Sequence, residues 1–186
     1  SLRRGVEFVG AKFFLVQFKP DNIANAKIQQ NYNANILRVI RQVRYSPFHQ
    51  EMKEATGKGS GILDLAIFVN GIPVATLELK TDFTQSVQHA IEQYKKDRKP
   101  FNLVTRKAEP LLAFNKRSLV HFAVSNEEVY MTTRLNGENT YFLPFNKGNG
   151  DASGNPTLAS RFWGANSAVT VGKSTNILYD WGDFVV

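Results

Sequence analysis

The chain has no cysteine among its 186 residues, which excludes a disulfide framework and any metal site built on thiolates. It has no apolar run of about eighteen residues, and the basic start "SLRRGVEFVG" precedes no signal-peptide core. These absences predict a cytoplasmic chain without a membrane partner. Acidic residues are scarce at the start, because residues 1–48 hold eight Lys and Arg against only Glu7 and Asp21.

The charge balance favours a polyanionic partner. The formal net charge is +7, a value that fits nucleic-acid binding without being specific to it. The content of 42% hydrophobic and 21% charged residues is ordinary for a globular protein. The length suits one domain with a sizeable core.

Hydrophobic patterning predicts a mixed α/β chain. Strands are expected at residues 11–18, 36–46, 118–125, 128–135 and 140–145. Helices are expected at residues 22–35 and 83–100, the second from Thr84 to Pro100. Residues 36–46 also admit a helix, but their β-branched residues favour the strand. The polar, Gly-rich stretch 49–61 predicts an exposed loop, and 146–156 has the composition of a linker.

Three charged residues interrupt the apolar runs on either side of Asn70-Gly71: Asp64, Glu78 and Lys80. Burying such groups is costly unless they are partnered, so charges in buried runs are candidates for function. Two carboxylates near one lysine can hold Mg²⁺ and position a water for phosphodiester hydrolysis. The period-2 geometry of a strand puts Glu78 and Lys80 on one face.

The pairing register of this hairpin decides whether the two acids can meet. A two-residue loop at Asn70-Gly71 pairs Asp64 with Leu77 and leaves Asp64 and Glu78 on opposite faces. One extra residue pairs Asp64 with Glu78 instead. A metal site therefore predicts a bulge or a longer loop at 70–73. From spacing alone, acids that merely face solvent beside a hairpin remain an open alternative.

The sequence resembles a known family in three stretches, "GILDLAIFVNGIPVATLELKTDFTQSVQHAIEQYKKDRKP", "PLLAFNKRSLVHFAVSNEEVYMTTRL" and "YFLPFNKG". Together with "QVRYS" they resemble the N-terminal part of the R (HsdR) subunit of type I restriction enzymes, from about Gly5 to Gly150. The resemblance implies a restriction-endonuclease-like domain of the PD-(D/E)xK class, a mixed β-sheet flanked by helices, over residues 1–150. Residues 151–186 would then lead toward a motor beyond Val186.

The resemblance also implies a function and its residues. Such domains cut double-stranded DNA with Mg²⁺ after an ATP-driven motor has translocated the duplex, in a complex with methylase and specificity subunits. ATP would serve only that motor. Asp64 and Glu78 match the acids of the motif and Lys80 its lysine, with the backbone carbonyl of Leu79 expected to complete the metal ligands. Leu63 replaces the proline of the motif's name, and a Q-x-x-x-Y motif common in related nucleases is absent as written.

Basic and polar residues elsewhere are candidates for contacts with DNA. The predicted set is Gln93, Tyr94, Lys95, Lys96, Arg98, Arg38, Arg41 and Arg44. The run at 95–99 is also typical of a solvated helix C-terminus, where cations are favoured by the helix dipole. On their strand, Arg38 and Arg44 share one face and Arg41 lies on the other.

Two further motifs are interpreted as incidental. "VGKST" at 171–175 looks like the end of a Walker A loop, but the required upstream glycine would fall at Ser167. His121 lies within an apolar run and is expected to be a hydrogen-bonded core residue. Two rival functions stay open: a non-catalytic DNA-binding or assembly module of the same fold, and a repair or junction nuclease of the same fold.

Overall fold

A six-stranded sheet forms the centre of the computed structural model, which describes residues 2, 4–20, 25–81, 86–126 and 128–145. The strands lie in chain order across it: β3 (Leu37–Arg44), β4 (Ile62–Val69), β5 (Ile72–Leu79), β6 (Val120–Val124), β7 (Val129–Thr132) and β8 (Leu143–Pro144). Strands β5 and β6 are parallel, and the other neighbours are antiparallel. A parallel pair needs a crossover connection, and helix α3 (Val87–Lys96) lies within it.

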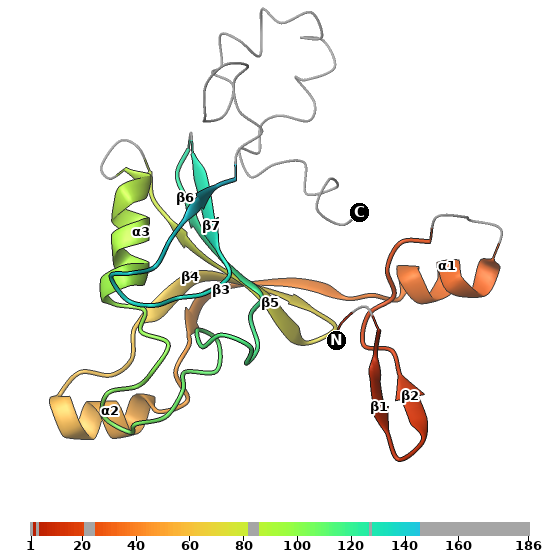
Figure 1. Cartoon of the computed structure of the whole chain (residues 1–186), viewed down its shortest axis with the longest axis horizontal. Helices are drawn as coiled ribbons and strands as arrows, with labels where there is room; N and C mark the ends of the chain where they lie inside the picture. The colour runs from red at the N-terminus through yellow and green to blue at the C-terminus, as the bar shows by residue number, and fades with distance from the viewer. Residues whose placement is uncertain (1, 3, 21–24, 82–85, 127, 146–186) are drawn as a thin grey trace, which may run out of the picture.

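Helix α3 covers one face of the sheet, against β5, β6 and β7 (Figure 1). Its side chains at helical spacing, Val87, Ala90, Ile91 and Tyr94, are all buried. The opposite face carries a second apolar cluster around Leu77 and Phe122. The sheet is thus apolar on both faces where β5 and β6 lie, and a charged residue on β5 is placed in a dry environment.

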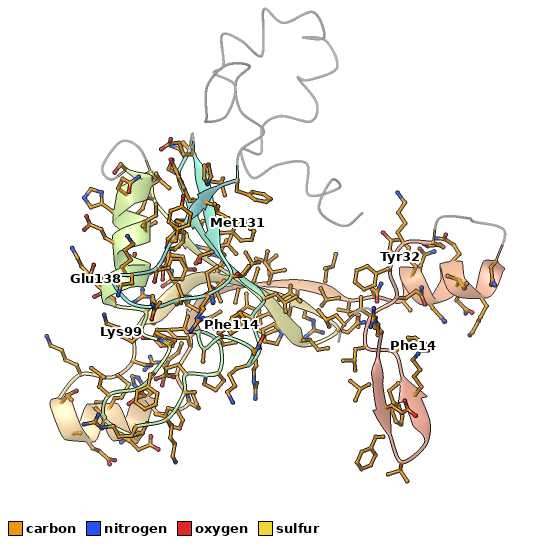
Figure 2. All side chains as sticks on the ribbon, viewed as in Figure 1. Phe14, Tyr32, Lys99, Phe114, Met131 and Glu138 are labelled. Carbon is orange, nitrogen blue, oxygen red and sulfur yellow. The ribbon has the colours of Figure 1, made fainter. Side chains whose placement is uncertain are left out.

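The remaining elements lie away from α3 or below it. A small hairpin, β1 (Val6–Phe8) with β2 (Ala11–Phe13), projects near α1 (Ala26–Asn33) at the far end of the long strands (Figure 1). Figure 2 shows Phe14, which directly follows β2, well separated from Lys99 beyond α3. Helix α2 (His49–Thr56) lies below the sheet. No helix within the described part of the chain is both long and apolar enough to cross a bilayer.

The β4–β5 hairpin contains the register shift that the acids require. Asn70 and Gly71 both have positive φ, 51° and 81°, and form a two-residue turn that pairs Val69 with Ile72. The shift occurs next, where Phe68 pairs with Pro73 but Ile67 pairs with Ala75, which leaves Val74 as the extra residue. The predicted shift is confirmed, but its location at 70–73 is corrected to Val74. Proline cannot donate to a ladder, so Pro73 is suited to this break.

Most predicted elements are present, with shorter bounds. The strands at 36–46, 118–125, 128–135 and 140–145 and the helices at 22–35 and 83–100 are confirmed, whereas 11–18 is a strand only as far as Phe13. The predicted loop at 49–61 is wrong, because its first half is α2, ended by Gly57 at a φ of 73°. Thr84, the linker at 146–156, the motif at 171–175 and the extension at 151–186 lie outside the described residues.

These observations agree with the predicted fold class. A mixed sheet whose parallel strands are connected through a helix, extended by antiparallel strands and flanked by helices, is an α/β architecture consistent with a restriction-endonuclease-like core.

Candidate active site

The bulge at Val74 brings Asp64 and Glu78 together. Leu65 pairs with Leu77 beyond the bulge, so the next position on each strand places Asp64 opposite Glu78. Asp64 is half-buried, and its Oδ2 accepts a hydrogen bond from the backbone N–H of Leu79 at 2.8 Å. The backbone of Leu79 on β5 is therefore in direct contact with the first acid.

Glu78 is fully buried, at 0% exposure. One of its carboxylate oxygens, Oε1, accepts a hydrogen bond from Arg98 Nε at 2.6 Å within an ion pair. The other oxygen, Oε2, is buried and has no hydrogen-bond partner within the part of the chain that the structure describes. A buried acceptor without a partner is costly, and it marks a position for a cation or a proton.

The pKa of the Glu78 carboxyl is raised to about 7. Burial raises it most; the charge and hydrogen bond of Arg98 lower it without offsetting the burial, and Asp64 raises it further. A cation that binds the two acids would replace the proton that Glu78 otherwise holds near neutral pH.

Lys80 lies on the same side of β5 as Glu78. Every second side chain from Thr76 to Lys80 points toward α3 and the residues that follow it. Thr76 hydrogen-bonds to Tyr94, and Glu78 pairs with Arg98. Lys80 Nζ donates a hydrogen bond to Gln93 Oε1 at 2.7 Å. No ion pair joins Lys80 to either acid among the described residues. The lysine is half-buried and oriented by an uncharged amide, so its charge is available to a ligand at the site.

The donor set fits a hard divalent cation. No group of three or more His, Cys, Asp or Glu side chains within the described ranges could hold a metal ion. Mg²⁺ does not need one, because it is usually bound through one or two carboxylates and keeps several waters. Glu78, whose Oε2 has no partner among the described residues, and the half-buried Asp64 opposite it satisfy this requirement.

Two residues predicted to contact DNA are not available for it. Tyr94 is fully buried, and its hydroxyl bonds to Thr76 Oγ1 at 2.9 Å. Arg98 is 7% exposed and is engaged by Glu78. Both residues were predicted to contact DNA because of their residue type and their position in or beside a basic run. Neither property indicates whether a side chain is buried. Gln93, also predicted to contact DNA, accepts a hydrogen bond from Lys80 and so orients the lysine.

The other basic candidates remain at the surface. Arg38, Arg41, Arg44 and Lys96 are exposed, and Lys95 is half-buried. The β3–β4 register pairs Arg38 with Phe68 and Arg41 with Leu65, so Arg38 shares the face of Asp64 and Arg41 lies on the opposite face. Arg44 contacts the His49 imidazole, and Lys96 pairs with Glu92 at 3.1 Å.

The Tyr94 hydroxyl is therefore expected to stabilise the fold. Tyr94→Phe removes its bond to Thr76, which keeps a 2.7 Å bond to His121 Nδ1. We expect a loss of about 1 kcal/mol in the free energy of unfolding by denaturant titration. Tyr141→Phe, at a ring that is 76% exposed, is the matched control and should change nothing. If Tyr94→Phe has unchanged stability but binds DNA more weakly, Tyr94 contacts DNA after all.

His121 is a core residue, as the sequence predicts. It is 1% exposed, and its ring lies 5.8 Å from that of Tyr94. Burial lowers its pKa to about 4, so the imidazole is neutral at physiological pH. It completes a hydrogen-bonded network of Tyr94, Thr76 and His121, in which Thr76 lies two residues before Glu78 on β5.

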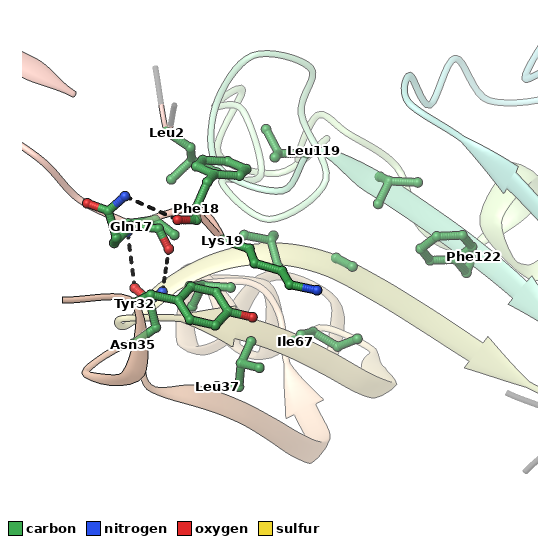
Figure 3. A pocket seen from close by; sticks show the side chains of 15 residues that line it. Leu2, Gln17, Phe18, Lys19, Tyr32, Asn35, Leu37, Ile67, Leu119 and Phe122 are labelled. Atoms are coloured by element: carbon green, nitrogen blue, oxygen red, sulfur yellow. Dashed lines mark hydrogen bonds between the residues drawn. The ribbon is translucent and has the colours of Figure 1, made fainter. Parts of the chain in front are cut away.

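A separate apolar cavity of about 490 Å³ lies between the N-terminal segment and the sheet. Gln17 and Asn35 close one side of it through hydrogen bonds (Figure 3). Its sheet wall includes Ala75 and Phe122, on the face opposite Glu78. None of the described residues that line it is acidic, so it is distinct from the carboxylate pair.

Comparison with known proteins identifies one family. The sequence model of one protein family, the type I restriction enzyme R protein N terminus, matches residues 16–140. Neither a curated protein nor a solved structure gives a match. The matched range contains the bulged hairpin, both acids, Lys80 and the whole of α3. The chain belongs to the family of the type I restriction enzyme R protein N terminus.

Proposed function

We propose that this domain is the Mg²⁺-dependent endonuclease of a type I restriction enzyme, and that it hydrolyses phosphodiester bonds of double-stranded DNA. The observation that carries the proposal is the register shift at Val74, which places Asp64 opposite Glu78 with Oε2 of Glu78 unpartnered. Family membership supports the reaction class, and the two inward-facing acids favour an enzyme over a non-catalytic module.

Each residue has a role that follows from its position. Asp64 and Oε2 of Glu78, with the backbone carbonyl of Leu79, would hold the cation. Bound Mg²⁺ supplies positive charge that polarises the phosphate and makes a nearby water more acidic. Lys80, oriented by Gln93, places an ammonium group beside the same site and can orient the water or stabilise charge on the phosphate.

The basic residues at the surface would contact the DNA backbone. Arg38 shares the face of Asp64, and Lys95 and Lys96 lie on the last turn of α3, the helix that carries Gln93. Contacts to phosphates position a duplex without reading its sequence. This agrees with a complex in which a specificity subunit selects the target, a methylase is also present, and an ATP-driven motor supplies the DNA.

Cation binding is expected to depend on pH. The cation competes with the proton on Glu78, so binding affinity should rise about tenfold per pH unit below the carboxyl's pKa of about 7 and level off above it. Titration of the intact protein with Mn²⁺ between pH 5.5 and 8.5, followed by electron paramagnetic resonance, measures this at about physiological salt.

Two variants define the site in that titration. Asp64→Asn and Glu78→Gln should each lose the pH-dependent Mn²⁺ binding, whereas Glu54→Gln, at an exposed position on α2, should keep it. Binding that is equal in Asp64→Asn and the unmodified protein would show that the two acids hold no metal.

A further inference from the structure

Arg98 is held in place by several parts of the chain at once. It follows α3 directly after the helix C-cap residue Asp97. Its Nε donates to Glu78 Oε1 at 2.6 Å, and one of its terminal nitrogens donates to the backbone carbonyl of Ile62 at 2.8 Å. The guanidinium carbon lies 5.7 Å from the centre of the Tyr45 ring. The fork of donors is thus fixed between α3, the start of β4 and the end of β3.

Gly61 leaves room for this guanidinium. A Cβ at Gly61 would lie 2.7 Å from the terminal nitrogen Nη1 of Arg98 and 3.3 Å from the Tyr45 ring. Any side chain there would force one of them to move. The absence of a side chain at Gly61 therefore belongs to the same arrangement as the bond between Arg98 and Glu78.

The fixed arginine makes the two oxygens of Glu78 different. Oε1 is occupied by Arg98, while Oε2 is buried and has no hydrogen-bond partner among the described residues; Asp64 lies opposite Glu78 on β4. Without Arg98 the carboxylate could rotate about its last bond and would lack the cation that offsets its burial. A lysine could supply the charge but not two separate N–H bonds in a planar fork.

We propose that Arg98 is a positioning residue of the nuclease site: it fixes the Glu78 carboxylate so that Oε2 is presented to the cation. This inference rests on the proposed function, because it assigns how one metal ligand is oriented. Arg98 takes no part in the reaction itself. Its contribution is expected to resemble that of other groups that hydrogen-bond to metal ligands, whose loss weakens metal binding by about 10- to 100-fold.

The test measures the affinity of the intact protein for Mn²⁺. Binding to Asp64→Asn is subtracted, so that cations bound at other sites do not contribute. Arg98→Met is expected to weaken binding at least about tenfold, and Arg98→Lys is expected not to restore it, because the positive charge alone is insufficient. Arg117→Met is the matched control. Arg117 is exposed and comes shortly before the start of β6, and Glu78 pairs with the other end of that strand. Loss of Arg117 should therefore leave the Mn²⁺ affinity unchanged.

A second variant keeps the inference testable if Arg98→Met does not fold, as judged by circular dichroism. Gly61→Ala retains the arginine but displaces its guanidinium, and it should also weaken Mn²⁺ binding. Full affinity in Arg98→Lys would show that charge suffices. Equal or tighter binding in the arginine variants would show that Arg98 is dispensable or competes with the cation. Each of these results overturns the inference while leaving the proposed function intact.

The proposed function fails in a different way. If Asp64→Asn binds as much Mn²⁺ as the unmodified protein, the two acids hold no metal. The proposed role of Arg98 is then also wrong.

Discussion

Replacing Glu78 with glutamine is expected to reduce DNA cleavage by the assembled restriction complex at least about 10³-fold. Glutamine keeps the size of the side chain but removes the charge and one acceptor oxygen that the cation requires. Loss of a metal that stabilises charge in the transition state costs several kcal/mol, which corresponds to a rate change of this size. Cleavage and ATP-driven translocation should be followed in the same reaction.

The comparison with translocation separates a catalytic effect from a loss of assembly. Under the proposed function, translocation should continue in Glu78→Gln, because the proposed motor would not use these two acids. Glu54→Gln, a change of the same chemistry at an exposed glutamate that accepts a hydrogen bond from Gln50, should cleave normally. Cleavage that persists in Glu78→Gln with intact translocation would remove Glu78 from the site.

Replacing Lys80 with methionine is expected to slow cleavage by about 10²- to 10⁴-fold while leaving Mn²⁺ affinity within about threefold of the unmodified value. Lys80 contacts neither acid through an ion pair; its ammonium bonds to Gln93 instead. Its removal should therefore affect the reaction more than the binding of the cation. Single-turnover cleavage and the Mn²⁺ titration measure the two effects separately.

The matched control for this prediction is Lys58→Met, which removes an exposed lysine after α2. It should change neither cleavage nor Mn²⁺ binding. Parallel losses of metal binding and cleavage in Lys80→Met would indicate that the lysine supports the structure of the site, and an unchanged cleavage rate would show that it has no role in the chemistry.

The sequence predicted the arrangement of charged residues on the hairpin because alternation and charge are local signals. Glu78 and Lys80 occur two residues apart on a strand, so their common face follows from strand geometry. The need for a register shift followed from counting residues between Asp64 and Glu78. Its position did not, since Asn70-Gly71 forms a good two-residue turn and the extra residue is Val74, beyond Pro73.

The residues that surround the acids could not be assigned from the sequence. Arg98 and Tyr94 stand in or beside a basic run, where exposure is the ordinary expectation, yet both are buried against β5. Their partners, Glu78 and Thr76, are distant in sequence and are reached only when α3 packs on the sheet. Helix α2 was missed for a different reason: its polar composition resembles a loop, and it buries none of its residues.

The most direct test of the account is anomalous diffraction from crystals of the protein soaked in Mn²⁺. We predict a peak between Asp64 and Glu78, at a coordination distance of about 2.1 Å from Oε2 of Glu78, with Arg98 still bonded to Oε1. The peak should be absent in Asp64→Asn crystals. Manganese bound only elsewhere, with the two carboxylates unoccupied at saturating concentration, would contradict the account.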